Sequence, residues 1–210
     1  GVAARHLTTN ITNLSASANT GSIFITEDDG ATVDAVSITV TDFNSNASTR
    51  IVTDAAQSDL ITNSNGDIVL VAMLGDITLN DGDSDDITVS ANGSGNILID
   101  ALAGNVTANE NILSSTGHIT IKGGVDIDLT SGVNVITAGT ISIDAEAGTL
   151  TMDGAANVTA TNSSARLKAA LDVIVGNITA SNVSLLSGAN IVNAADSTKN
   201  VTATNLRLAA

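Results

Sequence analysis

The sequence has 210 residues, which suits one domain or one run of structural repeats. Its formal net charge of −15 and the absence of a basic stripe argue against nucleic acid and anionic membranes as partners. The chain has no Cys, which excludes a disulfide scaffold and a thiolate metal site, and no apolar run reaches the ~20 residues of a membrane span.

Aromatic residues are nearly missing, since Phe24 and Phe43 are the only two. Hydrophobic residues nevertheless make up 43% of the chain and fall in patterned clusters, which argues against disorder. A core must therefore be filled by Val, Ile, Leu and Ala. The remaining Thr, Ser, Asn, Asp and Gly disfavour helices and favour short strands with tight corners.

The dominant signal is an internal repeat, Gly-x-aliphatic-x-aliphatic. It occurs as "GDITL" at Gly75, "GNILI" at Gly95, "GHITI" at Gly117 and "GTISI" at Gly139, with spacings of 20, 22 and 22 residues. Earlier in the chain, "GSIFI" at Gly21 and "VSITV" at Val36 are interpreted as degenerate members. A second series interleaves with the first, at Ile68, Ile87, Val106, Ile127 and Leu150.

Four aspartates follow the strand at Ile77 in the turn "NDGDSDD": Asp81, Asp83, Asp85 and Asp86. Their alternation resembles the start of a calcium loop with oxygen ligands. An EF-hand would need Gly and Glu at the sixth and twelfth positions, which hold Asp86 and Asn92. Two hypotheses remain: these four residues form a looser calcium site, or the turn is a solvated corner outside the core. No other cofactor is indicated.

Residues that could support catalysis are sparse. His6 and His118 are isolated in the sequence, and no nucleophile–base–acid arrangement can be recognised from spacing. Lys122 is the one base on a strand of the acidic region, and some β-helix proteins cleave polysaccharides with a calcium ion and a basic residue. We expect a protein that is not an enzyme, with a degenerate polysaccharide-acting enzyme as an alternative.

The segment "SSARLKAALDVIVG" from Ser163 could form a helix by propensity. It lies inside the repeat, however, so we expect strands around Leu167 and around Val173 and Val175.

The C-terminal third repeats as "NVTATN", "NITASN" and "NVTATN", which start at Asn157, Asn177 and Asn200. Each copy ends in an Asn between two strands, where the chain must turn, and Asn tolerates the left-handed conformation well. Stacked Asn side chains can also bond to one another. We therefore predict a structural ladder of Asn162, Asn182 and Asn205.

Units of about 20–23 residues with two or three short strands cannot bury their apolar face alone, whereas stacked units can. The sequence thus predicts an all-β fold, a parallel β-helix (β-solenoid), by default right-handed. Residues 1–210 would form a single solenoid of about ten coils, as a segment or subunit of a longer array.

With the repeats identified, "GNITASNVSLLSGANIV", "GTISIDAEAGTL" and "GSIFITEDDG" resemble the repeats of filamentous-haemagglutinin-like bacterial exoproteins. The resemblance lies in the pattern and covers nearly the whole chain. It implies a right-handed parallel β-helix, an extracellular or cell-surface location, and an adhesive or scaffolding role.

The first functional hypothesis is accordingly a stalk or repeat segment of a large cell-surface adhesin, with neighbouring repeats and a receptor or glycan as partners. The alternative is a self-assembling extracellular filament or surface-layer subunit, because a solenoid exposes strand edges at its ends that can pair with another chain.

Overall fold

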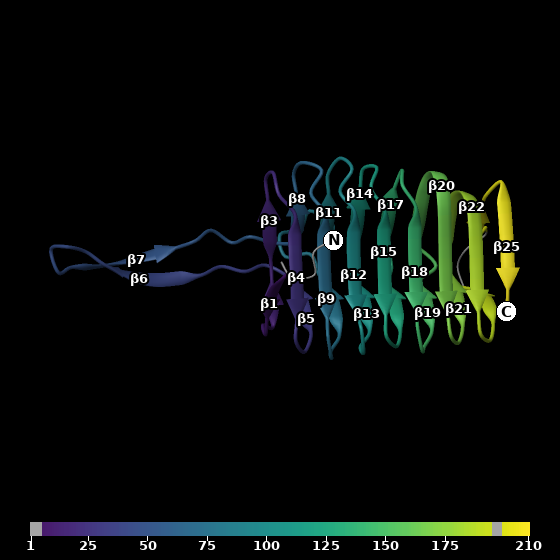
Figure 1. Ribbon diagram of the computed structural model, residues 1–210, viewed down its shortest axis with the longest axis horizontal. Coiled ribbons are helices and arrows are strands. Elements are labelled where there is room, and N and C mark those ends of the chain that lie inside the picture. Colours follow the sequence, from purple (N-terminus) through teal and green to yellow (C-terminus); the bar gives the residue numbers. More distant parts are fainter. Residues whose placement is uncertain (1–5, 195–198) are drawn as a thin grey trace.

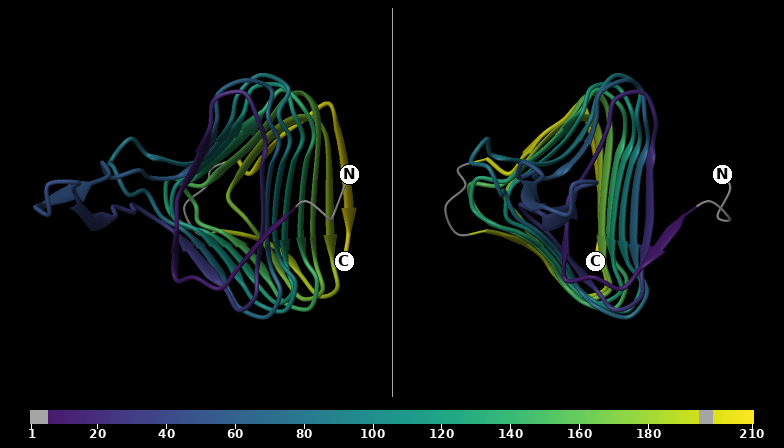
Figure 2. Two further views of the ribbon diagram at one scale, coloured as in Figure 1. Left: turned by 60° about the vertical axis from the view of Figure 1, so that its left-hand side comes forward. Right: turned by 90° about the vertical axis from the view of Figure 1, so that its left-hand side faces the viewer.

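Stacked parallel strands form nearly the whole molecule in the computed structural model, which describes residues 6–194 and 199–210. The strands lie side by side along one axis, and the coil is roughly triangular in cross-section (Figures 1 and 2). Seen from the N-terminal end, the chain runs clockwise and away from the viewer, so the coil is right-handed (Figure 2). The prediction of an all-β parallel β-helix is confirmed.

The first face of the coil is built by strands that pair in parallel register, most of which begin two residues after a glycine. They are β1 (Leu7–Thr9), β4 (Ile23–Glu27), β9 (Ile68–Ala72), β12 (Ile97–Ala101), β15 (Ile119–Gly123), β18 (Ile141–Ala145) and β25 (Asn205–Ala209).

The second face is a separate sheet of eight strands, one from each coil. They are β2 (Asn13–Leu14), β5 (Ala31–Val33), β10 (Ile77–Leu79), β13 (Val106–Ala108), β16 (Ile127–Leu129), β19 (Leu150–Met152), β21 (Val173–Val175) and β23 (Ile191–Asn193).

The third face joins the first through two long strands that bend round a corner, β20 (Asn157–Ala169) and β22 (Asn177–Ser187). Its other strands are β3 (Ala16–Ala18), β8 (Leu60–Thr62), β11 (Ile87–Ala91), β14 (Asn111–Ser114), β17 (Asn134–Thr137) and β24 (Val201–Thr202). The segment from Ser163 is therefore the second half of β20 followed by β21, which confirms the predicted strands at Leu167, Val173 and Val175.

The register corrects part of the predicted repeat. Ile97 pairs with Ile68 of β9, and Val106 pairs with Ile77 of β10, so Ile68 and Ile77 belong to the opposite series from those assigned by sequence. Ile87 belongs to neither series, because it starts β11 on the third face. The cause is the aspartate loop, which lengthens this coil to 29 residues against 22 in the next.

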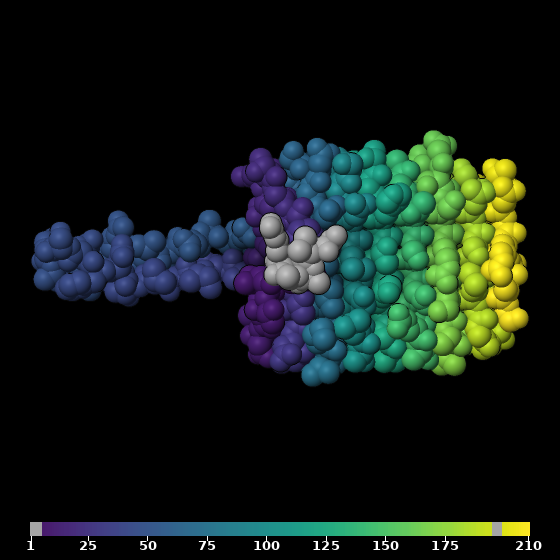
Figure 3. Space-filling model, in the orientation of Figure 1, coloured from purple at the N-terminus to yellow at the C-terminus, as the bar shows by residue number. Residues whose placement is uncertain are grey.

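A β-hairpin projects from the second coil, between β5 and β8. Its strands β6 (Thr39–Phe43) and β7 (Thr49–Thr53) pair only with each other, in antiparallel register. The hairpin runs along the solenoid axis and extends past the N-terminal coil (Figures 1 and 3). The stretch "VSITV" at Val36 is thus part of a hairpin and not a repeat member, because period-two alternation suits a free hairpin as well as a coil strand.

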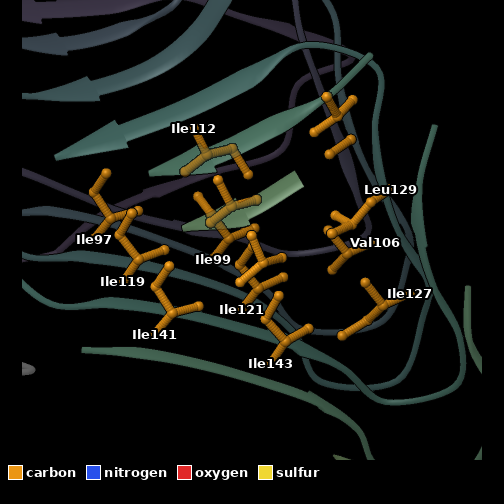
Figure 4. Packing of buried hydrophobic residues seen from close by; sticks show 14 of the residues in the cluster. Ile97, Ile99, Val106, Ile112, Ile119, Ile121, Ile127, Leu129, Ile141 and Ile143 are labelled. Carbon is orange, nitrogen blue, oxygen red and sulfur yellow. The ribbon is translucent and has the colours of Figure 1, made fainter. Parts of the chain in front are cut away.

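The core is a continuous column of aliphatic side chains inside the coil. Buried and outward-facing residues alternate in most strands of the coil, so that Ile97, Ile99 and Ala101 are buried while Leu98 and Asp100 lie between them on the outer side. Successive coils stack like residues, as the Ile97–Ile119–Ile141 and Ile99–Ile121–Ile143 columns show (Figure 4). Each such burial contributes about 1.5–3 kcal/mol relative to an exposed side chain.

Glycines mark the corner before the first face because the backbones of adjacent coils touch there. A Cβ on Gly95 would lie 2.1 Å from the carbonyl oxygen of Gly66, and one on Gly117 would lie 1.9 Å from that of Gly95. The repeated glycine is therefore a packing requirement, and it explains the motif from which the solenoid was predicted.

Polar ladders tie the coils together at the other corners. Asn134 Nδ2 donates to Asn111 Oδ1 over 2.8 Å, and Asn157 Nδ2 donates to Asn134 Oδ1 over 3.0 Å. Asn105 likewise donates from its backbone and side-chain nitrogens to Asp76 Oδ1. None of the described segments forms a helix long and apolar enough to cross a membrane.

Candidate functional site

The aspartate loop packs against the root of the hairpin, at the corner between the second and third faces. Gly82 N donates to Ser58 Oγ over 3.0 Å, and a Cβ on Gly82 would lie 2.3 Å from Ala35 N. Asn80 Nδ2 donates to Asp34 Oδ2 over 3.2 Å. The loop therefore touches the chain both where it enters the hairpin and where it leaves.

Asp81 serves the loop's own conformation. Its Oδ1 accepts hydrogen bonds from the backbone N–H groups of Asp83 (2.8 Å) and Ser84 (2.7 Å), and its Oδ2 accepts one from Asp86 N (2.8 Å). Burial alone would raise the pKa of Asp81, but these backbone N–H groups together hold it below its ordinary value. The side chain thus closes the turn by local side-chain–backbone bonds.

Two of the four predicted aspartates, Asp83 and Asp85, meet a third acid that sequence reasoning missed. One carboxylate oxygen from each of Asp59, Asp83 and Asp85 lies within 4.8 Å of the other two. Asp81 and Asp86 do not belong to this group. Asp86 instead offers its backbone carbonyl oxygen to Asn111, at 3.2 Å from the backbone nitrogen and 2.5 Å from the side-chain nitrogen.

Asp59 is the unusual member of the cluster because its side chain is fully buried. Its Oδ1 accepts a hydrogen bond from Ser58 Oγ over 2.7 Å, whereas its buried Oδ2 has no hydrogen-bond partner among the described residues. The pKa of Asp59 is raised to about 6: burial raises it most, the Ser58 hydrogen bond lowers it, and the charges of Asp83, Asp85 and Asp81 raise it.

None of the described basic side chains forms an ion pair with this group. Every salt bridge found in residues 6–194 and 199–210 lies elsewhere: Arg50–Asp42, Lys122–Glu146, Arg166–Asp144 and Lys168–Asp144. The nearby Glu110 has a raised pKa, caused by burial and by the charges of Asp86 and Asp81. Three carboxylates in a field of further acids form an all-oxygen donor set, which suits a hard cation.

Asp59 carried no recognisable signal in the sequence, because it precedes β8 as a lone acid on the far side of the hairpin from Asp34. Its φ of 66° places it in the left-handed region, which Asp tolerates better than most residues. Only the packing of the loop onto the hairpin root reveals its neighbours.

Of the predicted Asn ladder, the structure brings together Asn182 and Asn205, whose side chains are joined by a 2.8 Å hydrogen bond. Asn162 does not stand in this row. Ser164 lies opposite Asn182 and accepts its side-chain N–H over 3.2 Å. The corner in β20 is longer than the one in β22, so Asn162 sits before the row with a φ of 57° and makes the turn itself.

The residues considered for catalysis lie apart and have structural partners. Lys122 stands between Asp100 and Asp144 in an alternating charged column of the first face, and its Nζ lies 3.8 Å from Glu146 Oε1. His118 Nδ1 lies 2.9 Å from Thr140 Oγ1, and His6 stacks on Phe24 with ring centroids 5.7 Å apart.

Neither family models, nor curated proteins, nor solved structures give a match to this chain.

Proposed function

We propose that this chain is a stiff structural segment of a large extracellular adhesin, a stalk that holds other parts of the protein away from the cell surface. The observation that carries the proposal is the continuous stack of coils, whose three faces of parallel strands enclose one aliphatic core. Backbone hydrogen bonds between parallel strands link every coil to the next along the axis. Bending the rod would therefore break many of these hydrogen bonds at once.

Two further features support it. Side-chain ladders reinforce the corners, and a column of alternating charge runs through Asp100, Lys122, Asp144 and Lys168 on the first face. The repeats also resemble those of filamentous-haemagglutinin-like exoproteins, which are surface adhesins. The proposal places the protein outside the cell.

Two measurements test this function. Pulling the chain by its two ends in a single-molecule force experiment should show a series of unfolding steps, each releasing about one coil, because each repeat contacts only its neighbours. In the producing cells, antibodies to the hairpin should stain intact cells. Extension of the chain at low force without steps, or staining only after permeabilisation, would contradict the proposal.

One observation favours a second function, an extracellular filament joined end to end. At the C-terminal coil, Leu206 and Leu208 are 50% and 57% exposed over a hollow that Val175, Leu185 and Ile191 line. Among the described strands β25 pairs with β22 alone, so its other edge has no strand partner, and a further coil would cover both this edge and the hollow.

Sedimentation velocity at increasing concentration tests the filament. The Leu208→Lys variant should remain monomeric if copies stack through this end. Leu102→Lys, a change of equal charge at an exposed corner on the side of the rod, should assemble like the unmodified chain. A chain that stays monomeric up to high concentration would exclude the filament and leave the stalk.

A further inference from the structure

We propose that Asp59, Asp83 and Asp85 bind one Ca²⁺ ion at the root of the hairpin. This site is independent of the stalk and filament proposals, because it concerns only one corner of the second and third coils.

The three carboxylates have the spacing that the ligands of one Ca²⁺ ion require. Ca²⁺ takes oxygen ligands at about 2.3–2.6 Å, so two ligands of one ion can lie up to about 5 Å apart. The three carboxylate oxygens lie within 4.8 Å of one another and come from both sides of the corner, Asp59 from the hairpin root and the other two from the loop. Asp83 and Asp85 are exposed, which leaves room for water to complete the coordination.

Asp59 Oδ2 is a buried oxygen atom with no hydrogen-bond partner among the described residues. A buried carboxylate oxygen without a partner is strongly disfavoured, and buried acids in proteins are normally paired or bound to a metal. The surrounding charges, on Asp81, Asp83 and Asp85, are all negative and make the ionised form still less favourable. A divalent cation would supply the missing partner and reverse the sign of the local field.

The loop is already held in the shape that binding requires. Asp81 fixes the turn through three backbone N–H groups, and Asp85 Oδ1 accepts a hydrogen bond from Ile87 N over 2.9 Å. Because Gly82 also packs on Ala35 and Ser58, the loop is held against the hairpin root before any ion binds. The entropy lost on binding is correspondingly small.

The experiment uses the full chain, freed of divalent ions with EDTA and dialysed, and titrated with CaCl₂ at pH 7.5 in a calorimeter. We expect one ion per chain. At a Ca²⁺ concentration 100 times the dissociation constant, the melting temperature should rise by about 5 °C or more. MgCl₂ should bind more weakly, since Mg²⁺ requires closer, octahedral ligands and keeps its water.

Asp59→Asn is the decisive variant, because Asn fits the left-handed backbone and keeps the shape of the side chain. It should bind Ca²⁺ at least about tenfold more weakly, yet melt no lower than the unmodified chain in EDTA because a buried charge has been removed. Asp28→Asn, an equal charge change on an exposed turn at another corner, should leave binding unchanged.

The double variant Asp83→Asn/Asp85→Asn changes only exposed side chains and provides a second test that does not depend on the core. It should also lose the calorimetric signal. The proposal is overturned if the unmodified chain takes up no Ca²⁺ at about 10 mM, roughly ten times the dissociation constant of the weakest protein sites. It is also overturned if both variants bind Ca²⁺ as the unmodified chain does, or if Mg²⁺ binds more tightly.

Discussion

Asp59 couples proton binding to folding, because its carboxyl group is buried in the folded chain and solvated in the unfolded one. The pKa of Asp59 is about 6 in the folded chain, against the ordinary value of 3.8 that applies in the unfolded chain. Between these values the folded chain holds a proton that the unfolded chain has lost. The stabilising effect is thus fully present below pH 3.8 and is lost as the pH rises through 6.

In EDTA, we therefore expect the free energy of unfolding of the unmodified chain to fall by roughly 3 kcal/mol relative to Asp59→Asn between pH 3.5 and pH 7.5. Urea unfolding of both proteins at the two pH values measures this difference. Because both proteins contain the other titrating acids, their effects cancel. An equal stability difference at both pH values would show that Asp59 is not desolvated.

Gly117 tests the close approach of backbones at the corner before the first face. The Gly117→Ala variant would put a Cβ 1.9 Å from the carbonyl oxygen of Gly95, so the coils must separate locally. We expect a loss of about 3 kcal/mol or more in the free energy of unfolding, measured by urea denaturation.

The matched control is Gly21→Ala, in the same column at its N-terminal end, where an added Cβ meets nothing within 4 Å. Its stability should change by less than about 0.5 kcal/mol. Similar losses in both variants would mean that contact between the coils is not the cause of the loss at Gly117.

The two strands of the hairpin pair only with each other, in a sheet separate from those of the solenoid. Its side chains Phe43 and Ile51 are 74% and 76% exposed. Replacing residues 38–54 by a short glycine linker should change the melting temperature by less than about 2 °C, followed by circular dichroism, since few core contacts are lost. A large decrease would show that the hairpin packs on the rod in solution.

The elements themselves were largely predictable from sequence, whereas their assignment to faces was not. A Gly-x-Ile sequence opens β9, β10 and β12 alike, with Ile as the first residue of each strand. The local pattern therefore cannot distinguish the corner before the first face from the corner before the second. Coil length would distinguish them, but the aspartate loop changes it. Hence Ile68 and Ile77 exchanged places in the predicted series.

The candidate metal site was predictable from the sequence only in part. Asp83 and Asp85 are conspicuous because acids cluster in a short turn. Asp59 lies 24 residues before Asp83, with β8, β9 and β10 between them, and its burial follows from tertiary packing that no local pattern encodes. The Asn row shows a similar limit, since one longer corner moved Asn162 out of line with Asn182.

The whole rod should be least stable at its ends, because an end coil has one neighbouring coil and an inner coil has two. In amide hydrogen exchange, we expect the slowest exchange in β12, β15 and β18, and fast exchange in β1 and β25. Mass spectrometry of exchanged fragments measures the gradient. Uniform protection from β1 to β25 would instead indicate that the chain unfolds as one cooperative unit.

The inserted hairpin also has a consequence for the order in which the chain folds. Pairing β4 with β9 must bring together residues 45 apart in sequence, twice the separation in the regular coils, and this costs about 0.6 kcal/mol more in loop-closure entropy. The hairpin can form first, because its strands are adjacent in sequence, and its root then joins Val36 to Gln57. A locally folded insertion thus shortens the loop that the second coil has to close.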